Sequence, residues 1–317
     1  MSNRYLRELE EREKQAKAEN EQLRHKLQET TLDEYLHDCH NYIFKRLKIA
    51  DEKISATGYA TKVDGKRYPM WLRRWSDFAD IHRNNFDTIN EVFGDKRLFP
   101  PSIVTIDKTD DACPYPAANE NNIRIFEKIA IERPIRRILE KLLEVEPRLR
   151  EEFNFTALQF SNNNRELMWQ GKTCQTGDSD RSEESTYPDG LGLRKHPGGG
   201  ESLAFVFGYM AAHKLKVEDL KPALAKEELF IETIQQNNGD KVEDNRVKAN
   251  KQIAMALTQV FDHMIECGVA YGYVTAGEVL VFLNVRQNDL RTLYYHLCVP
   301  GEDAVDEMEA SRYVIPQ

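Results

Sequence analysis

The segment Pro188–Lys214, PDGLGLRKHPGGGESLAFVFGYMAAHK, decides how the rest of the chain can be arranged. Gly190–Arg194 is a short extended run, Pro197–Gly200 supplies a flexible turn, and Leu203–Phe207 is a continuous apolar stretch. This pattern predicts a β-hairpin whose second strand is buried. The buried strand is expected to end at Gly208-Tyr209-Met210.

The hairpin resembles the core of the PD-(D/E)XK nucleases, and Pro188-Asp189 matches the first two letters of that motif. The resemblance implies an α/β (α+β) fold in which a mixed sheet is flanked by helices. In such nucleases two acidic residues on neighbouring strands bind Mg²⁺, and a lysine assists the attacking water. Here Gly208 stands at the second acidic position and Met210 at the lysine position. The resemblance therefore implies a nuclease scaffold with an inactive site, and weak or absent Mg²⁺ binding.

Other residues offer partial replacements for the missing groups. Lys214 can reach back toward the lysine position. Glu140 and Glu144 lie one helical turn apart before the first strand, and either can lend a carboxylate as a weak metal ligand beside Asp189. The alternative for each is structural. Pro-Asp-Gly is an ordinary turn sequence, and acidic residues on an amphipathic helix most often face solvent.

Composition limits the class of protein. With 317 residues, 40% of them hydrophobic and 31% charged, the chain can form one large domain or two modest ones. No apolar run reaches the ~18 residues that a membrane helix needs, and the charged N-terminus does not resemble a signal peptide. The 5 cysteines form no CxxC pair, which favours reduced thiols over a zinc site. We expect an intracellular protein, in cytoplasm or nucleus. The net charge of −9 does not indicate nucleic-acid binding.

Residues 1–30 are expected to form a solvated helix, because they contain no Gly or Pro and many charged side chains. Leu6, Leu9, Leu23 and Leu27 fall on seam positions of a heptad pattern that polar residues interrupt. The pattern fits a short coiled coil, which would make a homodimer or higher oligomer, or a charged helix with no partner.

Three further units are expected. Residues 31–101 form a helical accessory region that begins at Thr31, residues 102–122 a linker, and residues 123–317 the nuclease-like domain. Lys66–Trp75 alternates basic and aromatic residues, which can stack on bases but more often pack in a core. Helices are expected at 76–93, 217–234 and 245–267, strands at 155–160, 271–274, 279–285 and 292–299, and a polar loop at 161–187.

Segments along most of the chain share a wider resemblance, and they include Thr31–His40, Arg73–Phe78, Thr258–Ile265 and Tyr294–Pro300. They are similar to fungal proteins in which a nuclease-like region precedes a protein-kinase-like domain, among them the Spok-type spore killers that act as meiotic drivers. The sequence ends at Gln317, where a kinase-like domain would follow.

The resemblance implies a toxin module of a spore killer, in which an ancestral Mg²⁺-dependent nuclease bound and hydrolysed DNA or RNA. The substitutions at Gly208 and Met210 imply that this chain has lost the reaction. The alternative is a non-catalytic scaffold or regulatory module that docks a kinase domain or a partner chain.

Overall fold

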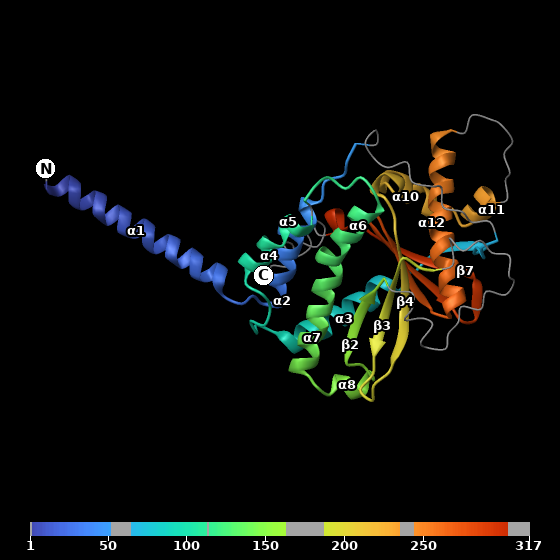
Figure 1. Ribbon diagram of the computed structural model, residues 1–317, viewed down its shortest axis with the longest axis horizontal. Helices are drawn as coiled ribbons and strands as arrows, with labels where there is room; N and C mark the ends of the chain where they lie inside the picture. The colour runs from blue at the N-terminus through green and yellow to red at the C-terminus, as the bar shows by residue number, and fades with distance from the viewer. Residues whose placement is uncertain (1, 52–64, 113, 163–186, 235–243, 304–317) are drawn as a thin grey trace, which may run out of the picture.

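The computed structural model describes residues 2–51, 65–112, 114–162, 187–234 and 244–303. These residues form a mixed sheet of seven strands in the order β1-β7-β6-β5-β4-β3-β2 (Figure 1). The strands are β1 (Trp71–Arg74), β2 (Ala157–Ser161), β3 (Gly190–Lys195), β4 (Glu201–Tyr209), β5 (Tyr271–Thr275), β6 (Leu280–Arg286) and β7 (Asp289–Cys298). Helices flank the sheet, so the predicted mixed α/β class is confirmed.

The helices of the described ranges vary widely in length. They are α1 (Ser2–Leu27), α2 (Leu32–Asp38), α3 (Phe78–Phe93), α4 (Ser102–Asp107), α5 (Thr109–Ala112), α6 (Glu120–Glu127), α7 (Arg133–Val145), α8 (Leu149–Glu152), α10 (Val217–Leu224), α11 (Leu229–Ile234) and α12 (Asn245–Cys267). Two π-helical turns, η1 (Cys39–Ile43) and η3 (Lys128–Glu132), continue α2 and connect α6 to α7.

The predicted hairpin is present and is extended by one strand on each side. β2, β3 and β4 pair antiparallel, and β5 pairs parallel with β4. The connection between β4 and β5 includes α12, as expected for a parallel pair, which needs a crossover. The chain therefore runs α7, β2, β3, β4, α12, β5 through the centre of the fold, and this order puts the start of β3 beside the end of β4.

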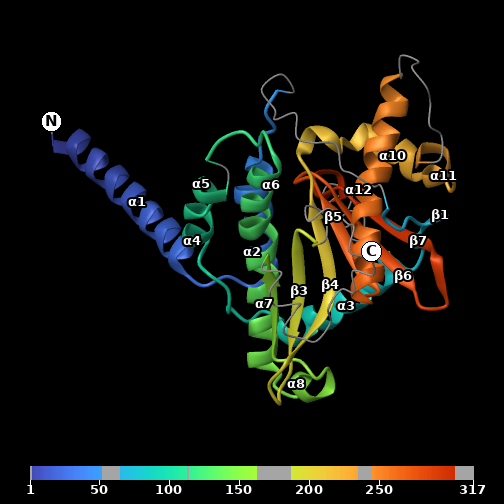
Figure 2. The ribbon, with the colours of Figure 1, turned by 45° about the vertical axis from the view of Figure 1, so that its right-hand side comes forward.

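The two faces of the sheet are covered by different helices (Figure 2). On one face, α12 buries Ile253, Leu257 and Val260 in a large apolar cluster with strand residues such as Val206 and Val274. The alternation of side chains along each strand gives the opposite face to Phe207, Tyr209 and Tyr273, which pack with Ile123 of α6. The sheet is thus buried between two helical layers.

The start of α2 follows a local capping rule. Thr31 caps α2 as expected, because its hydroxyl accepts from the backbone N–H of Glu34 while the Glu34 carboxylate accepts from that of Thr31. Arg97 fixes Glu34 through two hydrogen bonds of 2.8 and 2.9 Å. The preceding α1 extends away from the body (Figure 1), and its Leu23 and Leu27 are 51% and 59% exposed.

The structure differs from the expected organisation in three places. The range 102–122 contains α4, α5 and the start of α6, where the sequence pattern indicated a linker. The accessory range 31–101 supplies β1, which pairs parallel with β7 at the sheet edge. The expected helix 217–234 is divided into α10 and α11. The loop expected at 161–187 lies almost wholly outside the described residues.

Within the described ranges, no helix combines the length and the apolar character that crossing a bilayer requires.

Candidate functional site

Asp189 and Gly208 meet where β3 begins and β4 ends. Gly190, the first residue of β3, pairs with Phe207, so Asp189 directly precedes the paired region on one strand and Gly208 directly follows it on the other. The Asp189 carboxylate accepts a hydrogen bond from the backbone N–H of Tyr209, with 3.0 Å between Oδ2 and N. A Cβ built on Gly208 would lie 3.5 Å from the same Oδ2 atom. The fold therefore brings together the aspartate and the triplet position that the sequence motif singled out.

The environment of Asp189 favours its protonated form. Although the residue as a whole is exposed, the surrounding protein desolvates its carboxyl, and this desolvation raises the pKa to about 6. The hydrogen bond from Tyr209 and the charges of Lys66 and Arg124 oppose this rise, whereas Glu120 adds to it. Asp189 thus takes up a proton at a higher pH than an ordinary aspartate does.

A small pocket of about 190 Å³ opens beside Asp189. It is lined by Asp189, Tyr209 and three residues at the start of α6, which are Glu120, Asn121 and Arg124. Lys214 reaches this neighbourhood, because its Nζ lies 3.0 Å from the Glu120 Oε1. Lys214 is therefore held by an ion pair at the rim of the candidate site.

The lysine position of the motif is occupied by a core residue. Met210 is 4% exposed and belongs to the apolar cluster beneath α12. A Cβ at Gly208 would lie 3.0 Å from Cγ2 of Val260, which is tighter than ordinary van der Waals contact. The helix α12 has thus packed close to the strand at the position where the motif requires a carboxylate.

Glu140 and Glu144 do not line this pocket. Glu140 forms an ion pair of 3.5 Å with Arg136, and Glu144 one of 2.6 Å with Lys141, all on α7. Both glutamates are about half exposed. They lie on the solvated side of the helix, as acidic residues on an amphipathic helix most often do.

Two other acidic residues, Glu127 directly before η3 and Glu132 at its end, reach side chains of the sheet. The Tyr209 hydroxyl donates to Glu132 at 2.7 Å, and the Thr275 hydroxyl donates to Glu127 at 2.5 Å. Burial raises the pKa of Glu127 to about 8 and raises that of Glu132. The sequence contains a signal for them, since Glu127 interrupts the largely apolar run Ile123–Ile131 and Glu132 directly follows it.

The side chains at the tip of β4 do not fit the Mg²⁺ ion that the motif implies. Mg²⁺ requires oxygen ligands in octahedral geometry and is usually held by one or two carboxylates together with substrate phosphates. Asp189 offers one carboxylate with a raised pKa, and Gly208 offers none. Among the described residues, no group of three or more His, Cys, Asp and Glu side chains is arranged to hold a metal.

Comparison with known proteins relates the whole arrangement to one family. The model of the Spore killer 2 N-terminal domain matches residues 31–187 and 176–312. The meiotic driver SPOK2 of Podospora anserina is 38% identical over 316 residues, which is 90% of this chain and 40% of the relative. The chain thus spans well under half of that relative. No solved structure matches. Because the family model covers nearly the whole chain, the protein belongs to the Spore killer 2 N-terminal domain family.

Proposed function

We propose that this chain is the killing module of a spore-killer-type meiotic driver, built on a nuclease fold whose metal-binding and lysine positions are substituted. The family and the relative named a meiotic driver support the biological role. The order of α7, β2, β3, β4, α12 and β5 supports the nuclease fold, because it follows the helix, three strands, helix and strand of that core.

The observation that carries the proposal is the 3.5 Å between Asp189 Oδ2 and the Cβ position of Gly208. A carboxylate grown from that position would share a cation with Asp189, as paired carboxylates do in metal-dependent hydrolysis. The ancestor would then have hydrolysed phosphodiesters of DNA or RNA with Mg²⁺. The present chain, with Gly208 and Met210, is expected to be inactive.

The test restores the missing groups in the full chain. We would compare the unmodified protein with Gly208→Glu/Met210→Lys in a Val260→Ala background, because Val260 Cγ2 crowds the new side chain. Plasmid DNA and RNA are incubated with Mg²⁺ or Mn²⁺, and only the restored protein is expected to cleave. Leaving Met210 unchanged should lower the rate by roughly 100-fold, since a positioned cation stabilises the charged transition state.

A matched control adds Asp189→Ala to the restored protein and should abolish cleavage. Cleavage that persists without Asp189, or cleavage by the unmodified chain, would mean that the reaction is carried out elsewhere. Circular dichroism at the same temperature establishes that every variant is folded.

The second candidate function is a non-catalytic module that docks a kinase-like domain or a partner chain. It is favoured by the apolar packing of Met210 and Val260, which fills the motif positions with a well-formed core. A restored protein that is folded, binds metal and still cleaves nothing would favour this function over the first.

A further inference from the structure

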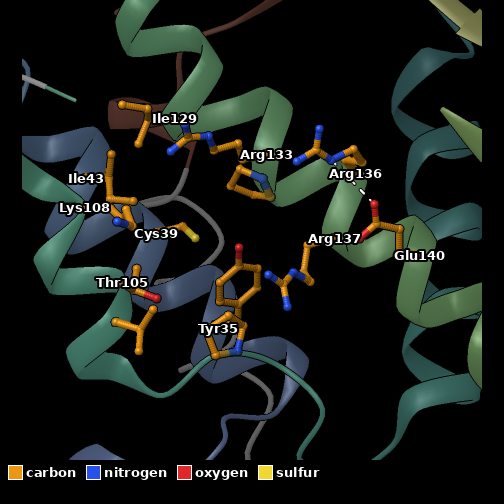
Figure 3. Close-up of a pocket in the computed structure, with 13 residues that line it drawn as sticks. Tyr35, Cys39, Ile43, Thr105, Lys108, Ile129, Arg133, Arg136, Arg137 and Glu140 are labelled. Atoms are coloured by element: carbon orange, nitrogen blue, oxygen red, sulfur yellow. Dashed lines mark ion pairs between the residues drawn. The ribbon is translucent and has the colours of Figure 1, made fainter. Parts of the chain in front are cut away.

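A second pocket lies between α2 with its π-helical turn, α4 and α7, and shares no lining residue with the pocket beside Asp189 (Figure 3). Its volume is about 240 Å³. Drug-sized ligands occupy cavities of roughly 300 to 1,000 Å³, so this pocket lies just below that range and suits a ligand at its small end.

Four cationic side chains surround the pocket. Arg133, Arg136 and Arg137 come from the first turns of α7, and Lys108 follows α4 (Figure 3). Such a concentration of positive charge is unexpected in a chain with a net charge of −9. Glu140 supplies the one carboxylate among the described lining residues.

The four cations differ in whether a carboxylate lies within ion-pair distance. Arg136 pairs with Glu140 at 3.5 Å, and Lys108 lies 3.6 Å from Asp107 and 3.5 Å from Asp111. Within the described ranges, Arg133 and Arg137 have no carboxylate within ion-pair distance. The buried Glu132 attracts Arg133 and Arg136 at longer range, but its carboxylate accepts the Tyr209 hydroxyl on the sheet side. Two guanidinium groups are therefore available to an anion.

The opposite wall of the pocket is largely apolar. Ile43 and Ile129 are 3% and 7% exposed, and the ring of Tyr35 is held between its neighbours with its hydroxyl directed toward the pocket (Figure 3). Tyr35 and Cys39 are hydrogen-bonded to each other, and burial raises the pKa of the Cys39 thiol to about 12. The thiol is thus a neutral part of the wall and not a nucleophile.

We propose that this pocket binds a small phosphorylated molecule, with the phosphoryl group on Arg133 and Arg137 and the organic part against the apolar wall. A planar guanidinium presents paired N–H donors that match phosphoryl oxygens, which is why arginine predominates in such sites. The limited volume favours a mononucleotide-sized ligand over a nucleic-acid strand. This inference is independent of the nuclease proposal.

The experiment measures binding of adenosine 5′-monophosphate to the full chain by isothermal titration calorimetry at low ionic strength. The double variant Arg133→Gln/Arg137→Gln should bind at least tenfold more weakly, because each charge-assisted hydrogen bond that is lost costs about a factor of ten. Both arginines are exposed, so their replacement should leave the fold intact. Arg83→Gln is the matched control, since Arg83 is an exposed helical arginine that pairs with Asp80 outside the pocket.

Further arms identify the source of the anion. Adenosine without phosphate should not bind, and Arg133→Lys/Arg137→Lys should recover only part of the affinity, because lysine keeps the charge but loses the fork. If inorganic phosphate binds as tightly as the nucleotide, the apolar wall contributes nothing to affinity, and the site recognises the phosphoryl group alone. Two results would overturn the proposal. One is equal affinity in the unmodified protein and the double glutamine variant. The other is no binding at 10 mM nucleotide, a concentration that corresponds to a binding free energy of about 3 kcal/mol.

Discussion

At the scale of single residues, Glu127 is a buried carboxyl whose hydrogen-bonding capacity is only partly met. Its side chain is fully buried, its Oε1 accepts from Thr275, and its Oε2 has no hydrogen-bond partner among the described residues. Burial raises the pKa of the carboxyl from 4.5 to about 8, so the folded protein holds this proton near neutral pH.

The raised pKa predicts a pH dependence of stability that one substitution removes. The folded protein holds the Glu127 proton in a range where the unfolded chain has lost it, so the stabilising contribution is complete below pH 4.5 and is lost as the pH rises to about 8. We expect the melting temperature to fall between pH 5 and pH 9, and to fall less in Glu127→Gln. As the pH rises between these two pKa values, the unfolding free energy of the unmodified protein should fall relative to that of Glu127→Gln by up to ~1.4 kcal/mol per pH unit.

Glu140→Gln is the control for that measurement, because Glu140 is exposed and pairs with Arg136. Differential scanning calorimetry across the pH range compares the three proteins. Parallel pH profiles for the unmodified protein and Glu127→Gln would contradict an elevated pKa at Glu127.

Part of the site was predictable residue by residue, and part was not. The motif at Asp189 and Gly208 is local to one hairpin, so the strand pairing that joins them follows from the sequence. The sequence indicated Glu140 and Glu144, which lie one helical turn apart before the first strand, and gave no role to Glu127 and Glu132. The π-helical turn η3 changes the helical phase between α6 and α7, and a 3.6-residue period cannot reveal that change.

At the scale of elements, the β3–β4 hairpin depends on the absence of a side chain at Gly190. A Cβ there would lie 2.1 Å from Cε2 of Phe207, whose ring is 1% exposed and stacks on Tyr273. Glycine therefore allows the Phe207 ring to lie across the neighbouring strand, and the strand carrying Asp189 is positioned by this contact.

Gly190→Ala is accordingly expected to destabilise the protein by about 1–3 kcal/mol, the usual cost of overpacking a filled core. The urea midpoint should fall, and Phe207→Leu in the same chain should recover part of the loss by making room for the methyl group. Gly198→Ala serves as the control, because nothing lies within 4 Å of its Cβ position. Equal midpoints for Gly190→Ala and Gly198→Ala would show that the ring moves aside without cost.

The long elements were predictable and the short ones were not. α12 has the predicted bounds because its apolar period persists over 23 residues and Gly268 ends it in the left-handed conformation. α4 and α5 span only 6 and 4 residues, too few for a periodic pattern to emerge. β1 spans 4 residues and forms only because β7 offers a free edge, a long-range partner that local sequence does not encode.

At the scale of the whole molecule, α1 is set apart from the rest. It extends away from the body in Figures 1 and 2, and the chain rejoins the fold at Thr30, whose backbone N–H donates to the carbonyl of Phe99 at 3.0 Å. Because Leu23 and Leu27 are largely exposed in the single chain, their burial requires another molecule.

Pairing of two chains through α1 is the oligomer that the heptad pattern predicts. We expect the full chain to be a dimer by light scattering coupled to size exclusion, and a chain lacking residues 1–28 to be a monomer with an unchanged melting temperature.

Leu23→Ala/Leu27→Ala keeps the length of α1 and should shift the dimer toward monomer, because each truncation removes about 2 kcal/mol or more of buried apolar contact per helix. Glu11→Ala is the control, since Glu11 is exposed on the same helix and lies off the seam positions. If the full chain stays monomeric over the concentration range in which short coiled coils associate, α1 is a solvated helix with no partner. If the truncated chain remains a dimer, the interface lies on the body of the molecule.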